Sequence, residues 1–306
     1  MAQKILVIHY SQSGQLTDII KSIIGPLQKS ADVEMVWENL QPCEPFPFPW
    51  SPLSFFDVFP ESVLLEAPGM NPFLFDSDAP YDLIILGYTV WYLSPSPPVV
   101  AFLKSAQANV MKDVPVITVV NCKDRWLMAQ ETVKEYIHKA GGKLIDNVVF
   151  VHQGNEITSL VSTLRWLLTG KKNGFWRIFP PAGVDKKEIE GAAKFGEAIL
   201  EALQNKDIKT GKSLLRGMGA VKVNPNIIQQ EKVGYRNFVV WARIVRAFGK
   251  RGQWRRLPCL FVFIFYLGVL VSLSVPFALI IRVLVNPFRK DAIRKEIEYF
   301  EQPSGD

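Results

Sequence analysis

The sequence predicts an α/β protein with a doubly wound parallel sheet of five strands in the order 2-1-3-4-5, followed by a C-terminal membrane-anchoring helical segment. Three observations support this prediction. Short apolar runs alternate with helical patterns over residues 1–205, the runs lack the polar alternation of half-exposed strands, and one later stretch of 25 residues has no charge. The 48% hydrophobic content of the 306-residue chain excludes a disordered protein.

The predicted strands and helices alternate in order along the chain. The five strands are expected at 5–9, 33–37, 83–87, 116–120 and 148–151. The connecting helices are expected at 16–27, 99–106, 129–142 and 185–203, with Gly141 and Gly142 closing the third and Asp185 opening the fourth. Parallel strands joined by right-handed crossovers bind ligands outside their carboxyl ends, so the loops after the strands form the candidate site.

The loop after the first strand has the composition of an anion-binding turn. It reads SQSGQLT and contains hydroxyl side chains around a glycine, with no acid before Asp18. Backbone amides at a helix N-terminus and short hydroxyl side chains can bind a phosphate group. The loop matches neither the Walker pattern nor the dinucleotide-binding glycine pattern. A polar strand-to-helix turn with a helix cap is the alternative interpretation.

This loop and its setting resemble the flavodoxin-like superfamily, whose first loop is of the type Ser/Thr-x-Thr-x-x-Thr and holds the phosphate of FMN. The resemblance covers residues 1–205. It implies that FMN is the cofactor and that its phosphate lies against Ser11, Gln12, Ser13, Gly14, Gln15, Leu16 and Thr17. Leu16 occupies the position of the last hydroxyl in the family pattern, so Thr17 either replaces it after a small shift or points elsewhere.

Two further loops stand where the family contacts the flavin ring. The loop after the third strand contributes Thr89, Val90, Trp91, Tyr92 and Leu93, and the loop after the fourth contributes Asn121, Cys122, Lys123 and Asp124. An aromatic side chain can stack on the flat ring, and backbone amides can face its polar edge. Ordinary packing is the alternative role for these aromatic residues.

Two insertions enlarge the predicted flavin domain. Residues 39–80 contain nine prolines and seven phenylalanines, which excludes a long helix and is too apolar for a solvated linker. This segment is expected to pack on the sheet edge, or to cover the flavin and accept an apolar substrate. Residues 156–184 add a helix containing Trp166 and a basic turn.

The remaining chain is expected to associate with a membrane. Residues 206–256 hold thirteen Lys or Arg and two acids, and their basic residues alternate with apolar ones near the following segment. Residues 257–281 are long and apolar enough to cross a bilayer, and Pro276 leaves spanning and re-entrant helices both open. Residues 282–306 are expected to be a polar tail. The apolar run disfavours nucleic acid as the partner of the basic segment, and the flavin domain is expected on the cytoplasmic side.

These features together predict an FMN-dependent, membrane-associated oxidoreductase acting on a lipid-like or quinone-like molecule. The opening ILVIHYSQSGQL and the Pro/Phe-rich segment are similar to the dialkylresorcinol condensing enzymes. That resemblance implies an aromatase that oxidises a dialkylcyclohexane-1,3-dione to a dialkylresorcinol, with a ketosynthase as partner and a homodimer as assembly. His9 and Tyr92 are the candidate bases. A membrane-bound NAD(P)H:quinone or flavodoxin-type reductase and a non-catalytic membrane scaffold are the alternatives, and no metal site is expected.

Overall fold

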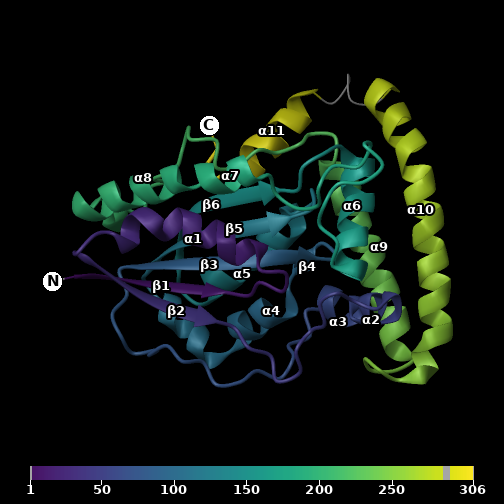
Figure 1. The fold of residues 1–306 in the computed structure, drawn as a ribbon, viewed down its shortest axis with the longest axis horizontal. Coiled ribbons are helices and arrows are strands. Elements are labelled where there is room, and N and C mark those ends of the chain that lie inside the picture. Colours follow the sequence, from purple (N-terminus) through teal and green to yellow (C-terminus); the bar gives the residue numbers. More distant parts are fainter. Residues whose placement is uncertain (1, 285–289, 306) are drawn as a thin grey trace.

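A twisted parallel sheet forms the centre of the structure, a computed structural model that describes residues 2–284 and 290–305 (Figure 1). Its long strands are β1 (Gln3–His9), β2 (Val33–Asn39), β3 (Leu83–Trp91), β5 (Pro115–Cys122) and β6 (Lys143–Val151). They pair in the order β2-β1-β3-β5-β6, and all four pairings are parallel. Counted along the chain among themselves, these strands follow the order 2-1-3-4-5, which is the doubly wound order of flavodoxin-like folds.

The sheet has one strand more than the sequence predicts. The short β4 (Ser94–Pro95) pairs antiparallel with the end of β3, so the sheet has six strands. The turn between them is formed by Tyr92 and Leu93, whose φ angles are +49° and +64°. Such turns normally contain Gly, Asn or Asp. Since none of these residues stands between Trp91 and Ser94, the sequence does not predict the hairpin.

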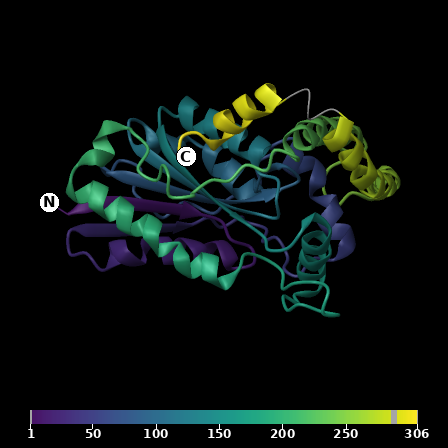
Figure 2. The same cartoon turned by 90° about the horizontal axis from the view of Figure 1, so that it is seen from above.

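Helices cover both faces of the sheet, as Figure 2 shows. One face carries α1 (Gln15–Gln28), α7 (Lys186–Gly191) and α8 (Ala193–Gln204), and the other carries α4 (Pro97–Lys104), α5 (Leu127–Lys139) and α11 (Lys290–Glu301). A Cβ at Gly196 would lie 1.7 Å from the carbonyl oxygen of Ile23, so only glycine permits this approach of α8 to α1. The single helix expected at 185–203 is two helices, because Gly191, a weak helix former, stands at the break.

The two insertions lie at the carboxyl edge of the sheet. Residues 39–80 contain α2 (Pro52–Asp57) and α3 (Phe59–Val63), each with a proline in its first turn, where the missing amide is tolerated. Residues 156–184 contain α6 (Glu156–Thr169), which Asn155 caps through hydrogen bonds from the amides of Ile157 and Thr158. Short 3₁₀ helices η1, η2 and η3 occur at Ala106–Met111, Asp207–Thr210 and Trp254–Arg256.

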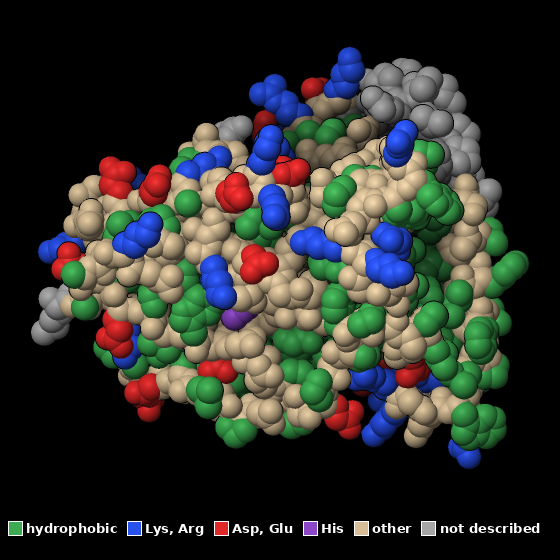
Figure 3. Space-filling model, in the orientation of Figure 1, with side chains coloured by type: hydrophobic (Ala, Val, Ile, Leu, Met, Phe, Trp, Pro, Cys, Tyr) green, Lys and Arg blue, Asp and Glu red, His purple; other side chains and the backbone are tan. Residues whose placement is uncertain are grey.

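A helical hairpin stands beside this edge. It consists of α9 (Ile228–Ala247) and α10 (Leu257–Leu284), which lie side by side in Figures 1 and 2. Among the described residues, one stretch, Trp254–Ser272, is long and apolar enough to cross a membrane, with a mean hydropathy of 1.7 and 17% of the window buried. Figure 3 shows hydrophobic side chains gathered along the part of the surface that α10 forms.

The basic segment at 206–256 is only partly available to a membrane. Arg256 is fully buried and binds the carboxylates of Asp57 and Glu61, and Arg246 binds Glu66 at 2.7 Å. These acids belong to the 39–80 insertion. The segment therefore fixes the insertion in place as well as carrying exposed charge.

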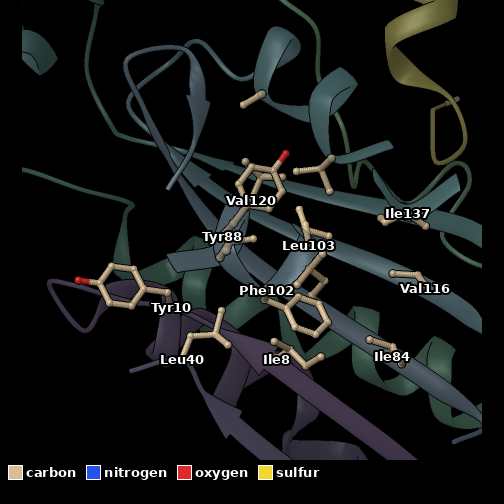
Figure 4. Close-up of a cluster of buried hydrophobic side chains, with 14 of the residues drawn as sticks. Ile8, Tyr10, Leu40, Ile84, Tyr88, Phe102, Leu103, Val116, Val120 and Ile137 are labelled. Atoms are coloured by element: carbon tan, nitrogen blue, oxygen red, sulfur yellow. The ribbon is translucent and has the colours of Figure 1, made fainter. Parts of the chain in front are cut away.

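The apolar core is divided by the sheet into two clusters. Ile5, Val7 and Leu83 pack under α1 and α8, and their neighbours in sequence point to the opposite side. Figure 4 shows part of that opposite cluster, to which β3 contributes Ile84, β5 contributes Val116 and α4 contributes Phe102. Both faces of each central strand are buried, which explains the continuous apolar runs in the sequence.

Candidate functional site

The loop after β1 has free backbone donors at the start of α1. Gly14 caps the helix with a φ of +84°, a conformation that favours glycine. Within the described part of the chain, the amides of Gln12, Ser13 and Gly14 donate to no protein group. The first amides of α1 also lack intrahelical acceptors. Since β1 carries its following helix on one face and β3 carries α4 on the other, this loop lies at the switch point where doubly wound sheets bind ligands.

The three residues that follow Gly14 point away from the loop. The Gln15 side chain is buried and its Oε1 accepts a 3.0 Å hydrogen bond from the amide of Val184. Leu16 is fully buried in the cluster beneath α1. The hydroxyl of Thr17 lies 3.0 Å from Nε2 of His9. Thr17 therefore does not replace the hydroxyl that Leu16 lacks, and Ser11 and Ser13 are the hydroxyl residues that remain at the loop.

The 39–80 insertion covers this loop. The Gln12 side-chain amide donates to the carbonyl oxygen of Pro47 at 2.6 Å, and its oxygen accepts from Nε1 of Trp50 at 3.1 Å. Phe46 and Trp50 both lie edge-on to Trp91, with ring centroids 5.0 and 5.5 Å away. We refer to residues 39–80 as the covering segment, because these contacts place it between the loop and solvent.

The β3–β4 turn is packed against this segment and against the helical hairpin. The hydroxyl of Tyr92 donates to the carbonyl oxygen of Phe55, and its ring centroid is 5.3 Å from that of Phe59. Burial raises the pKa of Tyr92 well above its usual value. Leu93 faces α9 at Gly234. Tyr92 is thus placed as a packing residue, and it has no unengaged hydroxyl to act as a base.

The end of β5 places Asn121 beside Thr89. The two residues are partners in the β3–β5 register, and Val90 continues β3 into its pairing with Pro95. Beyond Asn121, the Cys122 thiol is buried and its pKa lies well above the usual value because of that burial. The loop then turns away in a chain of ion pairs, in which Lys123 and Arg125 lie 2.6 and 2.9 Å from the carboxylate of Asp124.

Four buried polar atoms near the ends of β3 and β5 have no hydrogen-bond partner within the described residues. They are Thr89 Oγ1, Ser94 Oγ, Ser96 Oγ and Asn121 Oδ1, whereas the unpartnered His9 Nδ1 and Gln15 Nε2 lie on the α1 side. The four come from the ends of β3 and β5, from β4, and from the residue that precedes α4. An unsatisfied buried polar group costs about 1–3 kcal/mol, so these atoms favour a polar ligand or bound water at the carboxyl ends of β3 and β5.

His9 lies on a different side of the edge from Tyr92, and the structure does not bring the two candidate bases together. The His9 ring meets Trp37 edge-on at 5.4 Å and contacts Thr17. Burial lowers the pKa of His9 to about 4, against the opposing effect of the Glu38 carbonyl. His9 also lines an open groove of about 480 Å³ on the α1 side, whose other lining residues are Thr17, Lys21, Gln28, Trp37 and Asn39.

One buried acid near the site is not among the candidate residues predicted from the sequence. Glu231 on α9 is fully buried, and its Oε1 accepts a 2.8 Å hydrogen bond from the amide of Met128. Burial raises the pKa of Glu231 to about 7, against the opposing effect of that hydrogen bond. Glu231 is the only acid between Asp207 and Asp291 in the sequence. A single acid within a basic segment is the feature by which the sequence could have marked this residue.

No protein-family model matches the sequence, and no curated protein matches it. Several solved structures show limited similarity. A flavoprotein from Lactobacillus acidophilus NCFM in complex with FMN is 18% identical, with 48% of this chain and 93% of that chain covered and a TM-score of 0.39. A putative flavoprotein from Bacteroides uniformis ATCC 8492 is 16% identical, with 51% and 96% covered and a TM-score of 0.39. A flavodoxin from the domain Archaea is 12% identical, with 66% and 99% covered and a TM-score of 0.36.

Proposed function

We propose that the protein is an FMN-dependent oxidoreductase that acts on an apolar, lipid-like or quinone-like substrate at a membrane surface, with its flavin domain on the cytoplasmic side. The loop at residues 11–14 carries this proposal. Its free amides and the hydroxyls of Ser11 and Ser13 stand at the N-terminus of α1, where they would hold the FMN phosphate. Thr89 and Asn121, each with a buried atom in need of a partner, would face the polar edge of the flavin ring.

Access of FMN and substrate to the site depends on the covering segment. Trp50 is 3% exposed and is tied to Gln12 in the loop. Entry of FMN therefore requires this segment to move, and its return would exclude water from the site. Phe46, Trp50 and Trp91 supply apolar surface for the substrate and an aromatic face for the ring.

The most specific activity that we propose is aromatisation of a dialkylcyclohexane-1,3-dione to a dialkylresorcinol, with a ketosynthase supplying the substrate and a homodimer as the assembly. FMN, when bound, would supply a hydride acceptor. The net change removes one hydride and one proton from the substrate ring. A 1,3-dione enolises readily, so the reaction makes no demand for a strong base. This suits a site in which Tyr92 is held by a backbone carbonyl and His9 by Thr17.

A non-catalytic membrane scaffold is the second candidate, and one observation favours it. Gln12 has the only side-chain amide among residues 11–14, and it already forms hydrogen bonds with the carbonyl oxygen of Pro47 and with Nε1 of Trp50. Aromatic rings of the covering segment also lie directly against Trp91. A chain that had exchanged its cofactor for internal packing would show these contacts.

Flavin binding tests the proposal directly. The detergent-extracted full chain is titrated with FMN, and the visible spectrum and flavin fluorescence are recorded. Saturable quenching with a shifted spectrum is expected, and failure to bind FMN at any protein concentration tested would favour the scaffold. Anaerobic bleaching by a dialkylcyclohexane-1,3-dione, with release of the resorcinol, would then support the aromatase. Bleaching by NADPH alone would instead favour a quinone or flavodoxin-type reductase.

A further inference from the structure

One long side of α10 is apolar and faces outward. Four of its side chains are between 42% and 75% exposed, namely Phe261, Val262, Phe265 and Val269. Their spacing places them on one side of a helix. On the opposite side, Leu260 and Phe263 are buried against α9 and α3, and the Phe263 ring stacks on Phe59 at 4.0 Å. The inner side of α10 therefore belongs to the fold, and the outer side has no partner within the described residues.

Both flanks of α10 are fixed to the same α/β domain. Before the helix, Arg256 binds the carboxylates of Asp57 and Glu61. After it, α11 returns to the sheet, where Phe300 is 3% exposed and the Ser304 hydroxyl donates to Asp146 at 2.8 Å. A helix that crosses a bilayer separates its flanks by about 30 Å of hydrocarbon. The contacts at both flanks therefore favour a helix that lies along the domain over one that leads away from it.

Exposed positive charge borders this apolar surface. Arg236 and Arg243 are exposed on α9, and Lys250 and Arg255 are exposed in the turn that leads into α10. Within the described part of the chain, no acid forms an ion pair with these four residues. Apolar side chains lie among them, with exposed fractions of 40–73%, at Val240, Ile244, Phe248 and Trp254. Basic and aromatic residues beside an apolar helix face are typical of segments that lie in the interface of anionic membranes.

We propose that the α9–α10 hairpin docks on an anionic membrane surface with α10 lying in the plane of the bilayer, so that the protein is bound to one leaflet and does not span. The outer side of α10 enters the acyl boundary, and Arg236, Arg243, Lys250 and Arg255 contact lipid phosphates. The inference rests on the membrane association in the proposed function and is independent of flavin binding. In the proposed orientation, the β3–β4 turn, which contacts α9 at Gly234, lies between the membrane surface and the loop at residues 11–14.

A second copy of the chain is the competing occupant of this surface. In a two-fold symmetric interface the same patch occurs on both subunits, so the four basic residues of one copy would lie near those of the other. Like charges at an interface oppose association. An anionic membrane satisfies the same charges, which is why the lipid surface is the occupant that the structure favours.

Vesicle binding tests the docking surface. The purified full chain is diluted from detergent into vesicles of phosphatidylcholine alone or with phosphatidylglycerol, and the bound fraction is measured by flotation without added FMN. We expect binding to the anionic vesicles, weakened at least about tenfold by the double variant Phe261→Glu/Phe265→Glu. Arg243→Glu/Arg255→Glu should remove the preference for anionic lipid. Leu74→Glu, at a side chain 88% exposed on the covering segment, is the matched control and should bind as the unmodified chain does.

Cysteine accessibility distinguishes in-plane docking from a spanning helix. In a Cys43→Ser/Cys259→Ser background, Gln253→Cys and Arg294→Cys place reporters before and after α10, on exposed positions. A membrane-impermeant maleimide added outside sealed vesicles should label both. Labelling of only one would show that α10 crosses the bilayer and would overturn the proposal. Failure to bind any vesicle, or a dimer that Phe261→Glu/Phe265→Glu dissociates in place of vesicle binding, would also overturn it. Vesicle binding without FMN binding would overturn only the proposed redox function.

Discussion

Nε of Arg256 lies 2.6 Å from Oδ1 of Asp57, and the fully buried guanidinium joins the foot of α10 to the covering segment. Glu61 completes the arrangement at 2.6 Å from Nη1. The two partners are separated by 199 positions in the sequence. Arg256 therefore links the covering segment, which lies over the loop at residues 11–14, to the helix that is proposed to bind the membrane.

Loss of this contact should destabilise the protein strongly. Removing one partner of a buried ion pair leaves an uncompensated charge and costs about 3–5 kcal/mol. We expect Arg256→Met to lower the free energy of unfolding by about this amount in urea titrations followed by tryptophan fluorescence. Arg255→Met is the matched control, because Arg255 is exposed, and it should change stability by less than about 0.5 kcal/mol. Equal effects of the two variants would show that the buried contact is not maintained in solution.

The bond between Trp50 and Gln12 should oppose cofactor entry. Trp50→Phe keeps an aromatic ring in the cluster and removes the 3.1 Å hydrogen bond to Gln12. If the covering segment must open, loss of a bond worth about 0.5–1.5 kcal/mol should tighten apparent FMN binding by about 2- to 10-fold. Stopped-flow flavin fluorescence would show the gain as faster association. Trp37→Phe, on β2 beside His9, is the control that should leave association unchanged.

A carboxylate in the loop should abolish FMN binding. Ser13→Asp places a negative charge at the start of α1, where the phosphate is proposed to bind, and like charges repel. Fluorescence titration should show affinity reduced by at least about 100-fold, with the far-UV circular dichroism spectrum unchanged. Ser22→Asp, in the middle of the same helix, provides the comparison and should bind FMN normally. Normal binding by Ser13→Asp would show that the phosphate lies elsewhere.

Glu231 should lower stability as the pH rises. Its pKa is about 7 in the folded protein and 4.5 ordinarily, so the folded state binds more protons between these values. The contribution of Glu231 to the free energy of unfolding is therefore greatest below pH 4.5 and falls by about 3 kcal/mol as the pH rises to 7 and above. His9 and His152, whose pKa values are lowered by burial to about 4, act in the opposite direction over pH 4 to 6.5.

Removing the Glu231 titration should therefore expose the histidine contribution. We expect Glu231→Gln to show a clear rise in unfolding free energy between pH 4.5 and 6.5, where the unmodified chain shows a weaker dependence. Urea titrations at a series of pH values measure this. Unchanged pH dependence in the variant would show that Glu231 is ionised in the folded protein throughout this range.

The α/β part of the fold was predictable because each central strand is buried on both faces. Apolar runs such as residues 5–9 and 83–87 indicate the strand positions. β1 begins two residues before the first run and ends with it, and β3 begins with the second run and extends four residues beyond it. The β3–β4 hairpin was not predictable, since Tyr92 and Leu93 adopt positive φ only under the constraint of packing against Phe59 and α9. Its formation depends on tertiary contacts that local patterns do not record.

The candidate site was predictable in position and less so in detail. Strand ends locate the three loops, because parallel strands bring their carboxyl ends to one edge. The pairing of Thr17 with His9 and of Gln12 with Trp50 depends on side-chain geometry across 8 and 38 residues of sequence. The burial of Arg256 likewise contradicts its place in a basic run, where charge patterning alone predicts a solvated residue.

The attachment of α10 at both flanks has a kinetic consequence. In the proposed orientation the helix cannot pivot, so the carboxyl edge of the sheet keeps one height above the lipid headgroups. A substrate dissolved in the bilayer would then reach the protein by lateral diffusion within the leaflet. Turnover would follow the mole fraction of substrate in the lipid, and adding inert lipid at constant total substrate would slow the reaction by surface dilution.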